Sequence, residues 1–124
     1  MKTIKFSKKY FCKYNELYNI KDCSGIYILT SGNFNVYVGL AERQLIKDRL
    51  KNHFNTSRTH NKLLKYWLKS DFTKTYFQYY CYEKERIREL ETFCIVKMQP
   101  LANFIEHKQK NIENNYFRNC ILMY

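Results

Sequence analysis

Two short runs of the sequence, residues 25–29 and 36–39, alternate isoleucine or valine with tyrosine, leucine or glycine. A period of two is typical of β-strands, and the turn-forming residues 31–33 lie between the runs, so the pattern predicts a β-hairpin. With residues 31–33 as the loop, Tyr27 would lie directly opposite Tyr37, and the two phenols would share one face of the sheet. A loop of two or four residues would place them on opposite faces. On the hairpin alone, the plainer interpretation is that tyrosine is favoured in strands.

Four further segments have the periodicity of regular structure. Apolar residues recur at helical spacing in residues 43–54, 61–70 and 84–98, and Pro100, the only proline, ends the last of these helices. Residues 73–82 are rich in threonine, tyrosine and phenylalanine and predict a third strand. No internal repeat, linker or low-complexity segment interrupts the chain, so we expect a single domain of the α/β class.

The two ends of the chain are basic and weakly patterned. Within residues 1–21, lysines are interleaved with aromatic residues, and the tyrosine and leucine spacing over residues 10–18 is helical. A basic arm or short helix packed beside the hairpin, and a solvated segment without a role, are both open interpretations. Residues 104–124 fit a final helix or a docked tail.

Three charged or titratable residues fall on helix faces that should be buried. Arg49 and His53 are four residues apart, so both project from the same face of the predicted helix over residues 43–54. They either line a cleft or represent a snorkelling arginine and a hydrogen-bonded core histidine. Glu91 lies in the apolar stripe of the helix over residues 84–98 and should meet an arginine, a metal or another acid.

The charge of the chain indicates a binder of anions. Lysine and arginine number 22 against 11 acidic residues, which gives a formal net charge of +11. Such a surplus attracts phosphate backbones or anionic membranes. Because 18% of the residues are aromatic, bases can stack beside basic side chains, which favours nucleic acid as the partner. Lys62, Lys65 and Lys69 form an outward stripe of the same sign, although such a run is usually a solvated face.

Length and cysteine content limit the class further. A chain of 124 residues, 45% of them hydrophobic, is large enough to form its own core. An apolar run of about 18 residues and a signal-peptide pattern are both absent, which predicts an intracellular protein, cytoplasmic or located at the nucleoid or nucleus, without membrane insertion. The five cysteines are an odd set without a Cys-x-x-Cys motif, which argues against a disulfide framework and against zinc and predicts reduced thiols.

Taken in order, these residues carry a resemblance to a known family. Gly25-Ile26-Tyr27 and Tyr37-Val38-Gly39 resemble the two motifs that name the GIY-YIG nuclease superfamily, with valine in place of one isoleucine. The later positions are similar to the version found in phage and mobile-element homing endonucleases, and they are Arg49, His53, His60, Glu91 nine residues before Pro100, and Asn103. The resemblance covers residues 25–103, with a longer segment than usual between Tyr37 and Arg49.

The resemblance implies a small α/β (α+β) domain, with a three-stranded sheet built on the hairpin and flanked by helices, that hydrolyses DNA phosphodiester bonds. Glu91 would hold Mg²⁺ or Mn²⁺, and Arg49 would stabilise charge on the phosphate. Tyr27 is the preferred group for activating water, with Tyr37 orienting it or sharing the role, because Arg49, lysines and the metal are expected to lower the phenol pKa. His53 would relay the proton or hold Tyr27.

The remaining matched positions and the basic surface are candidates for binding DNA. They are His60, Lys51, Lys62, Lys65, Lys69 and Asn103, and Asn103 has a structural role as its alternative. We expect an endonuclease that is structure-selective or weakly sequence-specific, acts in DNA repair or in a mobile element, and has a protein partner for targeting as an option. Two other functions stay open: a nucleic-acid-binding module without turnover, and an adaptor whose basic surface serves a protein partner.

Overall fold

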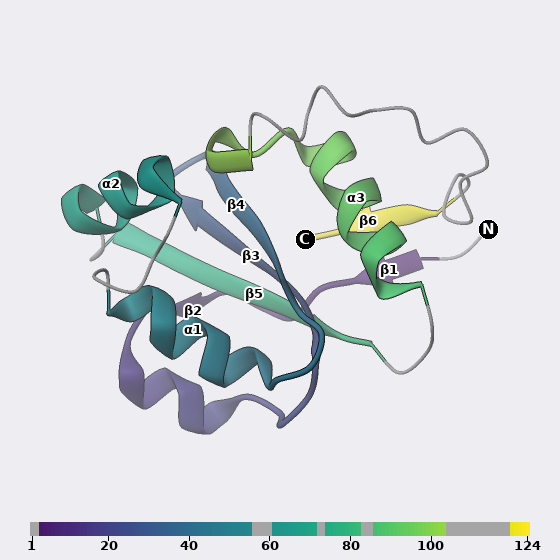
Figure 1. The fold of residues 1–124 in the computed structure, drawn as a ribbon, viewed down its shortest axis with the longest axis horizontal. Helices are drawn as coiled ribbons and strands as arrows, with labels where there is room; N and C mark the ends of the chain where they lie inside the picture. The colour runs from purple at the N-terminus through teal and green to yellow at the C-terminus, as the bar shows by residue number, and fades with distance from the viewer. Residues whose placement is uncertain (1–2, 56–60, 72–73, 83–85, 104–119) are drawn as a thin grey trace.

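The computed structural model describes residues 3–55, 61–71, 74–82, 86–103 and 120–124 (Figure 1). Its main feature is an antiparallel sheet of four strands in the order β2-β5-β3-β4. The strands are β2 Tyr10–Phe11, β3 Gly25–Ser31, β4 Phe34–Ala41 and β5 Thr75–Cys81. β3 and β4 are the predicted hairpin and β5 is the predicted third strand, whereas β2 is a fourth strand that the sequence pattern did not indicate. The predicted α+β class is confirmed.

The loop of the hairpin is shorter than predicted. It consists of residues 32–33 and not 31–33. Gly32 has a φ of 60°, a conformation that glycine adopts without a steric cost and that tight hairpin turns require. A two-residue loop taken alone slips the register by one residue, which would place Tyr27 and Tyr37 on opposite faces of the sheet. An irregularity in β4 prevents this outcome.

A β-bulge in β4 restores the shared face. The register shifts after Leu29, so that Val36 is an extra residue without a partner in β3. Tyr27 is therefore paired with Gly39, and Tyr37 is paired with Leu29. The predicted direct pairing of the two tyrosines is wrong, but their rings lie on one face with centroids 6.2 Å apart.

Three α-helices pack against the sheet: α1 Ile46–Phe54, α2 Lys62–Asp71 and α3 Ile87–Met98. α1 and α3 fall within segments whose periodicity predicts a helix, and α2 coincides with the predicted helix over residues 61–70 except that it ends one residue later, at Asp71. α1 begins later than predicted because Leu45 has an extended backbone, with φ −73° and ψ 145°. α3 begins after Arg86, whose φ of 73° lies outside the helical region, and residues 84–85 of the predicted helix lie outside the described residues.

The helices form two cores on the two faces of the sheet. α1 and α2 cover the face that carries Tyr27 and Leu29, and α3 covers the face that carries Ile26 and Ile28. The alternation along β3 explains the division, because successive side chains of a strand point to opposite faces. In Figure 1, α1 and α2 lie toward one end of the molecule and α3 lies toward the other.

The N-terminal segment forms short elements and not one helix. β1 Thr3–Lys5 pairs in parallel with β6 Ile121–Met123, and β2 pairs with β5. A 3-10 helix, η1, spans Tyr14–Asn19 and lies beside α1 (Figure 1). The basic arm is therefore part of the folded structure, and the end of the chain is docked as a strand. Within the described part of the chain, the helices are too short or too polar to span a membrane.

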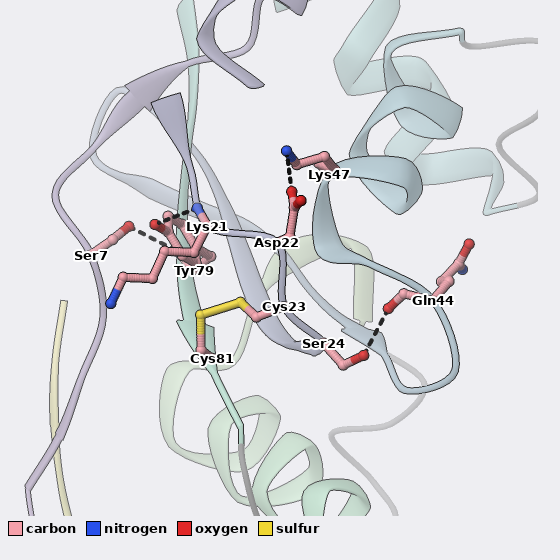
Figure 2. Close-up of a disulfide and its surroundings, with 9 residues drawn as sticks. All are labelled: Ser7, Lys21, Asp22, Cys23, Ser24, Gln44, Lys47, Tyr79 and Cys81. Atoms are coloured by element: carbon pink, nitrogen blue, oxygen red, sulfur yellow. Dashed lines mark hydrogen bonds and ion pairs between the residues drawn. A yellow bond between two sulfur atoms is a disulfide. The ribbon is translucent and has the colours of Figure 1, made fainter. Parts of the chain in front are cut away.

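A disulfide joins Cys23 to Cys81, so the prediction that all five cysteines are reduced thiols is wrong for this pair (Figure 2). The two residues are 58 positions apart in the sequence. They meet because β3 and β5 pair with Gly25 opposite Cys81. This contact arises from sheet pairing, and the spacing of cysteines along the chain did not indicate it. The free cysteines are Cys12, Cys94 and Cys120.

The segment that carries Cys23 also fixes the start of α1. The backbone N–H of Ile46 donates to the Cys23 carbonyl at 2.9 Å. Lys47, on the first turn of α1, forms an ion pair with Asp22 (Figure 2). α1 therefore begins at a fixed point beside β3, and this placement determines where the later residues of the helix meet the sheet.

Candidate active site

Tyr27, Tyr37 and His53 form a cluster of rings between the hairpin and α1. The Tyr27 hydroxyl lies 2.6 Å from Nε2 of His53 in a buried hydrogen bond. The Tyr37 ring centroid is 5.6 Å from that of His53. Tyr27 is 0% exposed and His53 is 5% exposed, whereas Tyr37 is half-buried. The structure thus brings together three site residues that the sequence singled out, and it gives only Tyr37 among the three appreciable contact with solvent.

Gly39 makes room for the Tyr27 ring. A Cβ built on Gly39 would overlap Cζ and the hydroxyl oxygen of Tyr27. Glycine inside a strand weakens the sheet and often marks a close approach of another group. Here that group is the phenol itself, so the glycine of the second motif permits the position of the tyrosine of the first.

Arg49 lies one helical turn before His53 and faces both phenols. Its side chain is half-buried, and its Nε atom is buried without a hydrogen-bond partner. The guanidinium interacts by charge and hydrogen bonding with the hydroxyls of Tyr27 and Tyr37. The four-residue spacing therefore directs both α1 residues at the tyrosines. Arg49 meets the two phenols and does not snorkel past its neighbours, whereas His53 is the hydrogen-bonded core histidine of the plainer interpretation.

Burial sets the protonation state of this cluster. Burial, followed by the charge of Tyr37, raises the pKa of Tyr27 above the usual value of a phenol, and Arg49 opposes this rise only in part. The sequence led us to expect that Arg49, lysines and a bound metal together would lower this pKa; among the protein's own groups, desolvation of the fully buried phenolate outweighs Arg49. Burial and the charge of Arg49 lower the pKa of His53 to about 4. Both groups are neutral at pH 7 and share a hydrogen bond whose donor depends on the imidazole tautomer.

Glu91 approaches the cluster from the other side of the sheet. It is half-buried on α3, which packs against β3 and β4. Because β4 is the edge of the four-stranded sheet, the α1 face and the α3 face meet along it. The charge of Glu91 contributes to the raised pKa of Tyr27. The carboxylate and the phenols therefore belong to one electrostatic environment.

An ion pair connects α3 with the residue that follows β4. Nε and Nη2 of Arg88 donate to the carboxylate of Glu42 at distances between 2.9 and 3.2 Å. Arg88 lies three residues before Glu91, so this contact positions the turn of α3 that carries the candidate ligand. The two residues are 46 positions apart and no periodicity connects them, so the sequence pattern does not indicate this pair.

A metal ion at this site would depend on Glu91. In the part of the chain that the structure describes, there is no group of three or more histidine, cysteine, aspartate or glutamate side chains that could hold a metal. Mg²⁺ and Mn²⁺ prefer oxygen ligands, and Mg²⁺ is commonly held by one or two carboxylates together with waters and substrate phosphates. The half-buried carboxylate of Glu91 is a ligand of the type that such an ion takes.

Asn103 has contacts that fit its structural role. It lies in a 3-10 turn, η4, that spans Leu101–Asn103. Its Oδ1 accepts from the N–H of Val38 at 2.8 Å, and its Nδ2 donates to the Val38 carbonyl at 3.1 Å. The side chain is buried and its amide acts as an extra partner for the edge strand β4. Since both polar ends of the amide are used inside the protein, a contact with DNA is the weaker of the two roles considered for it.

The other candidate DNA-binding residues lie on the helices that cover the tyrosine face. Lys51 on α1 is exposed, Lys62 and Lys69 on α2 are exposed, and Lys65 is half-buried. His60 lies outside the described residues. The basic stripe and the phenols are therefore on the same side of the sheet.

Comparison with protein families agrees with this fold and site. The protein-family model described as the GIY-YIG catalytic domain matches residues 23–106, more than half of the chain. The chain therefore belongs to the GIY-YIG family, whose domain implies nuclease activity with DNA as the substrate. Comparison with curated proteins and with solved structures gave no match. The matched segment contains both tyrosines, Arg49, His53 and Glu91.

Proposed function

We propose that the protein is a metal-dependent endonuclease that hydrolyses phosphodiester bonds in DNA. The observation that supports the proposal is the cluster of Tyr27, Tyr37, Arg49 and His53, together with Glu91 on α3, whose charge contributes to the raised pKa of Tyr27. Hydrolysis needs a positioned water, neutralisation of charge on the phosphate and help for the leaving oxygen. The cluster contains a side chain suited to each requirement.

Arg49 and Glu91 would neutralise negative charge on the scissile phosphate, Arg49 directly and Glu91 through a bound metal ion. The guanidinium of Arg49 offers planar paired donors that match phosphate oxygens, and its half-buried position strengthens the interaction relative to bulk water. Glu91 would hold Mg²⁺ or Mn²⁺, which supplies Lewis-acid stabilisation of the phosphate when bound. Arg49 approaches from α1 and Glu91 from α3, so the scissile phosphate lies between them along β4.

Solvent access favours Tyr37 as the phenol that contacts the attacking water. Tyr27 is fully buried, and burial raises its pKa, so it reaches neither bulk water nor its ionised form readily. Tyr37 is half-buried and lies beside the same arginine. We therefore assign water orientation to Tyr37, and we assign to the hydrogen-bonded pair of Tyr27 and His53 the task of holding Arg49 and Tyr37 in place. Tyr37 thus keeps the orienting role expected from the sequence, and Tyr27 no longer contacts the water.

The basic surface accounts for substrate selection by shape more than by sequence. Lys51, Lys62 and Lys69 are exposed on α1 and α2. Lysine contacts with phosphates position a protein on DNA but carry no direct sequence information. Cleavage of nicked, branched or flapped DNA with weak sequence preference follows. DNA repair and mobile-element transfer, in the cytoplasm, nucleoid or nucleus and with a targeting partner, are the settings in which such an enzyme acts.

The test is cleavage of supercoiled and branched DNA by the purified chain in Mg²⁺, in Mn²⁺ and in EDTA. Glu91→Gln removes the candidate metal ligand, and Glu89→Gln makes the same chemical change at an exposed residue of the same helix. We expect metal-dependent cutting by the wild type and by Glu89→Gln, and none by Glu91→Gln, with DNA binding kept by all three proteins.

The same experiment separates the proposed enzyme from a binding module. Binding that weakens with salt, without cutting by the wild type in either metal, would replace the enzyme with a nucleic-acid-binding function. Cutting that persists in Glu91→Gln at the wild-type rate would contradict the role of Glu91 and leave the nuclease assignment in place.

A further inference from the structure

An exposed aromatic patch lies at the tip of the hairpin and on α2. Phe34, the first residue of β4, is 57% exposed, and its ring centroid is 6.3 Å from that of the half-buried Trp67. Tyr66 is 67% exposed and Leu63 is 37% exposed. Leu63 precedes Tyr66 and Trp67 by three and four residues, so the three are neighbours on the helix surface. We call Phe34, Leu63, Tyr66 and Trp67 the aromatic patch.

Lysines flank the aromatic patch. Lys62 and Lys69 are exposed and lie four residues before and three residues after Tyr66, so they share its outer face of α2. An apolar patch alone would suit many partners, but ammonium groups on both sides of a ring complement phosphates. The net charge of the chain, +11, has the same sign. Rings that stack on bases, next to cations that meet the backbone, are the features by which proteins bind single-stranded nucleic acid.

The patch lies on the strand that leads to the candidate catalytic tyrosine. Phe34 and Tyr37 are three residues apart in β4, and the bulged Val36 lies between them. At a rise of about 3.3 Å per residue, less where the strand is bulged, their positions are roughly 7–10 Å apart. Nucleotides of one strand are about 3.4 Å apart in a duplex and farther apart in an unstacked strand, so this separation corresponds to at most about three nucleotides.

Bases inside a duplex are covered on both faces by their neighbours, whereas unpaired bases offer a face to a protein ring. We propose that the aromatic patch binds unpaired bases of the DNA substrate, within about three nucleotides of the scissile phosphate, and so directs the enzyme to flaps, branches or frayed ends. The distance to the cut rests on the proposed function. The binding of unpaired bases does not, and it is tested without cleavage.

Aromatic residues elsewhere on the surface provide a control. In the N-terminal segment, Lys8 and Lys13 each lie 5.2 Å from a ring centroid, those of Tyr10 and Phe11. Cations of the chain itself therefore already occupy positions over these rings. Tyr18, on η1, is 87% exposed and lies outside the aromatic patch, so its truncation removes a surface phenol without touching the patch.

The experiment measures DNA binding by the full chain in EDTA, so that cleavage does not interfere. The probes are a fluorescein-labelled single-stranded oligonucleotide and a blunt duplex of the same length. The Phe34→Ala, Tyr66→Ala double variant should bind the single strand about tenfold more weakly, and the duplex within about twofold of the wild type. Tyr18→Ala should bind both probes like the wild type. Circular dichroism checks that each variant is folded.

A second measurement needs only the wild type. Trp67 is the only tryptophan of the chain, so a base that stacks at the patch should quench its fluorescence when unlabelled single-stranded DNA is added. The blunt duplex should quench it less. An equal loss of affinity for both probes, no loss for the single strand, or absence of quenching would overturn the proposal. Each of these failures leaves the metal-dependent cutting described above unaffected, and a wild type that binds single strands but never cuts would overturn only the proposed function.

Discussion

The two faces of the sheet are built from the same strands but differ in chemistry. On the α3 face, Ile26, Ile28 and Val38 pack against apolar side chains of α3 that include Leu90 and Phe93. On the α1 face, the alternate positions of the same strands present two phenols to an arginine and a histidine. The α3 face is mainly an apolar core, and the α1 face includes the charged and titratable side chains of Arg49 and His53.

Both faces bury polar atoms that lack hydrogen-bond partners. On the α1 face these are Nδ1 of His53 and Nε of Arg49, and on the α3 face they are Oγ1 of Thr30 and Oε1 of Gln78. Each buried unsatisfied polar group costs roughly 1–3 kcal/mol. A core that served only stability would fill these positions with apolar side chains. The faces differ in the kind of polar group that they bury, because the charged and titratable side chains, Arg49 and His53, are on the α1 face. We therefore assign the chemistry to the α1 face, with Glu91 contributing from α3.

The largest expected effect is that of Arg49→Ala on cleavage. Loss of the charge that meets the phosphate should slow the reaction about 10³-fold, or about 4 kcal/mol in activation free energy. Single-turnover cleavage in Mg²⁺ with excess enzyme measures the rate. Arg43→Ala removes an exposed arginine just before α1 and should stay within about twofold of the wild type. An equal loss in both variants would mean that general attraction of DNA explains the effect.

On the packing face, Leu90→Ala should change stability and leave chemistry intact. Truncation of this fully buried leucine leaves a cavity and should lower the free energy of unfolding by about 3 kcal/mol. Urea denaturation measures this loss, with Thr92→Ala, an exposed position of α3, as the control. At a temperature where the variant is folded, its cleavage rate should equal that of the wild type. A slower cleavage rate in the folded variant would contradict the assignment of Leu90 to packing alone.

The pKa of His53 makes the stability of the α1 face depend on pH. Its folded value of about 4 is below the ordinary 6.5, so the unfolded chain binds more protons between these two values. The free energy of unfolding should therefore fall as the pH drops from 6.5 to 4, by up to about 3 kcal/mol from this group. His53→Gln should remove that part of the slope in denaturation curves taken across this range, and His107→Gln should retain it. Identical slopes in the two variants would show that His53 is not held neutral by the fold.

A smaller effect is expected at the contact of Gly39 with Tyr27. Gly39→Ala should destabilise the protein by about 2 kcal/mol, because the added Cβ displaces the buried ring. Replacing the ring as well, in Gly39→Ala, Tyr27→Leu, makes room for the methyl group. The double variant should therefore be less destabilised than the sum of the two single variants, as a thermodynamic cycle would show. Strict additivity would mean that the two residues are not in contact.

Much of the fold was predictable because local periodicity indicates it. The hairpin, the third strand and the three helices follow from the spacing of apolar residues, and the four-residue spacing placed Arg49 and His53 on one face. Tyr27 and Tyr37 share a face as predicted, but for a different reason. The loop is one residue shorter than predicted, which alone would place them on opposite faces, and the extra residue at the Val36 bulge brings them back to the same face. Loop length and bulges depend on turn geometry that the residue pattern does not record.

Features that depend on distant contacts were not predictable. The disulfide between Cys23 and Cys81 follows from the pairing of β3 with β5, and Asn103 reaches Val38 across 65 positions of sequence. The raised pKa of Tyr27 follows from complete burial, which the motif does not reveal. In each case the deciding quantity is a tertiary distance or a degree of desolvation, and neither is encoded in local spacing.

The most direct test of the two-face account compares the loss of one hydroxyl on each side. Tyr37→Phe removes a half-buried phenol oxygen from the α1 face, and Tyr80→Phe removes a half-buried one from β5, which packs with the α3 core. Single-turnover cleavage in Mg²⁺ should slow about 10²-fold or more in Tyr37→Phe and remain within about twofold of the wild type in Tyr80→Phe. Wild-type cleavage by Tyr37→Phe, or equal slowing of both variants, would contradict the account.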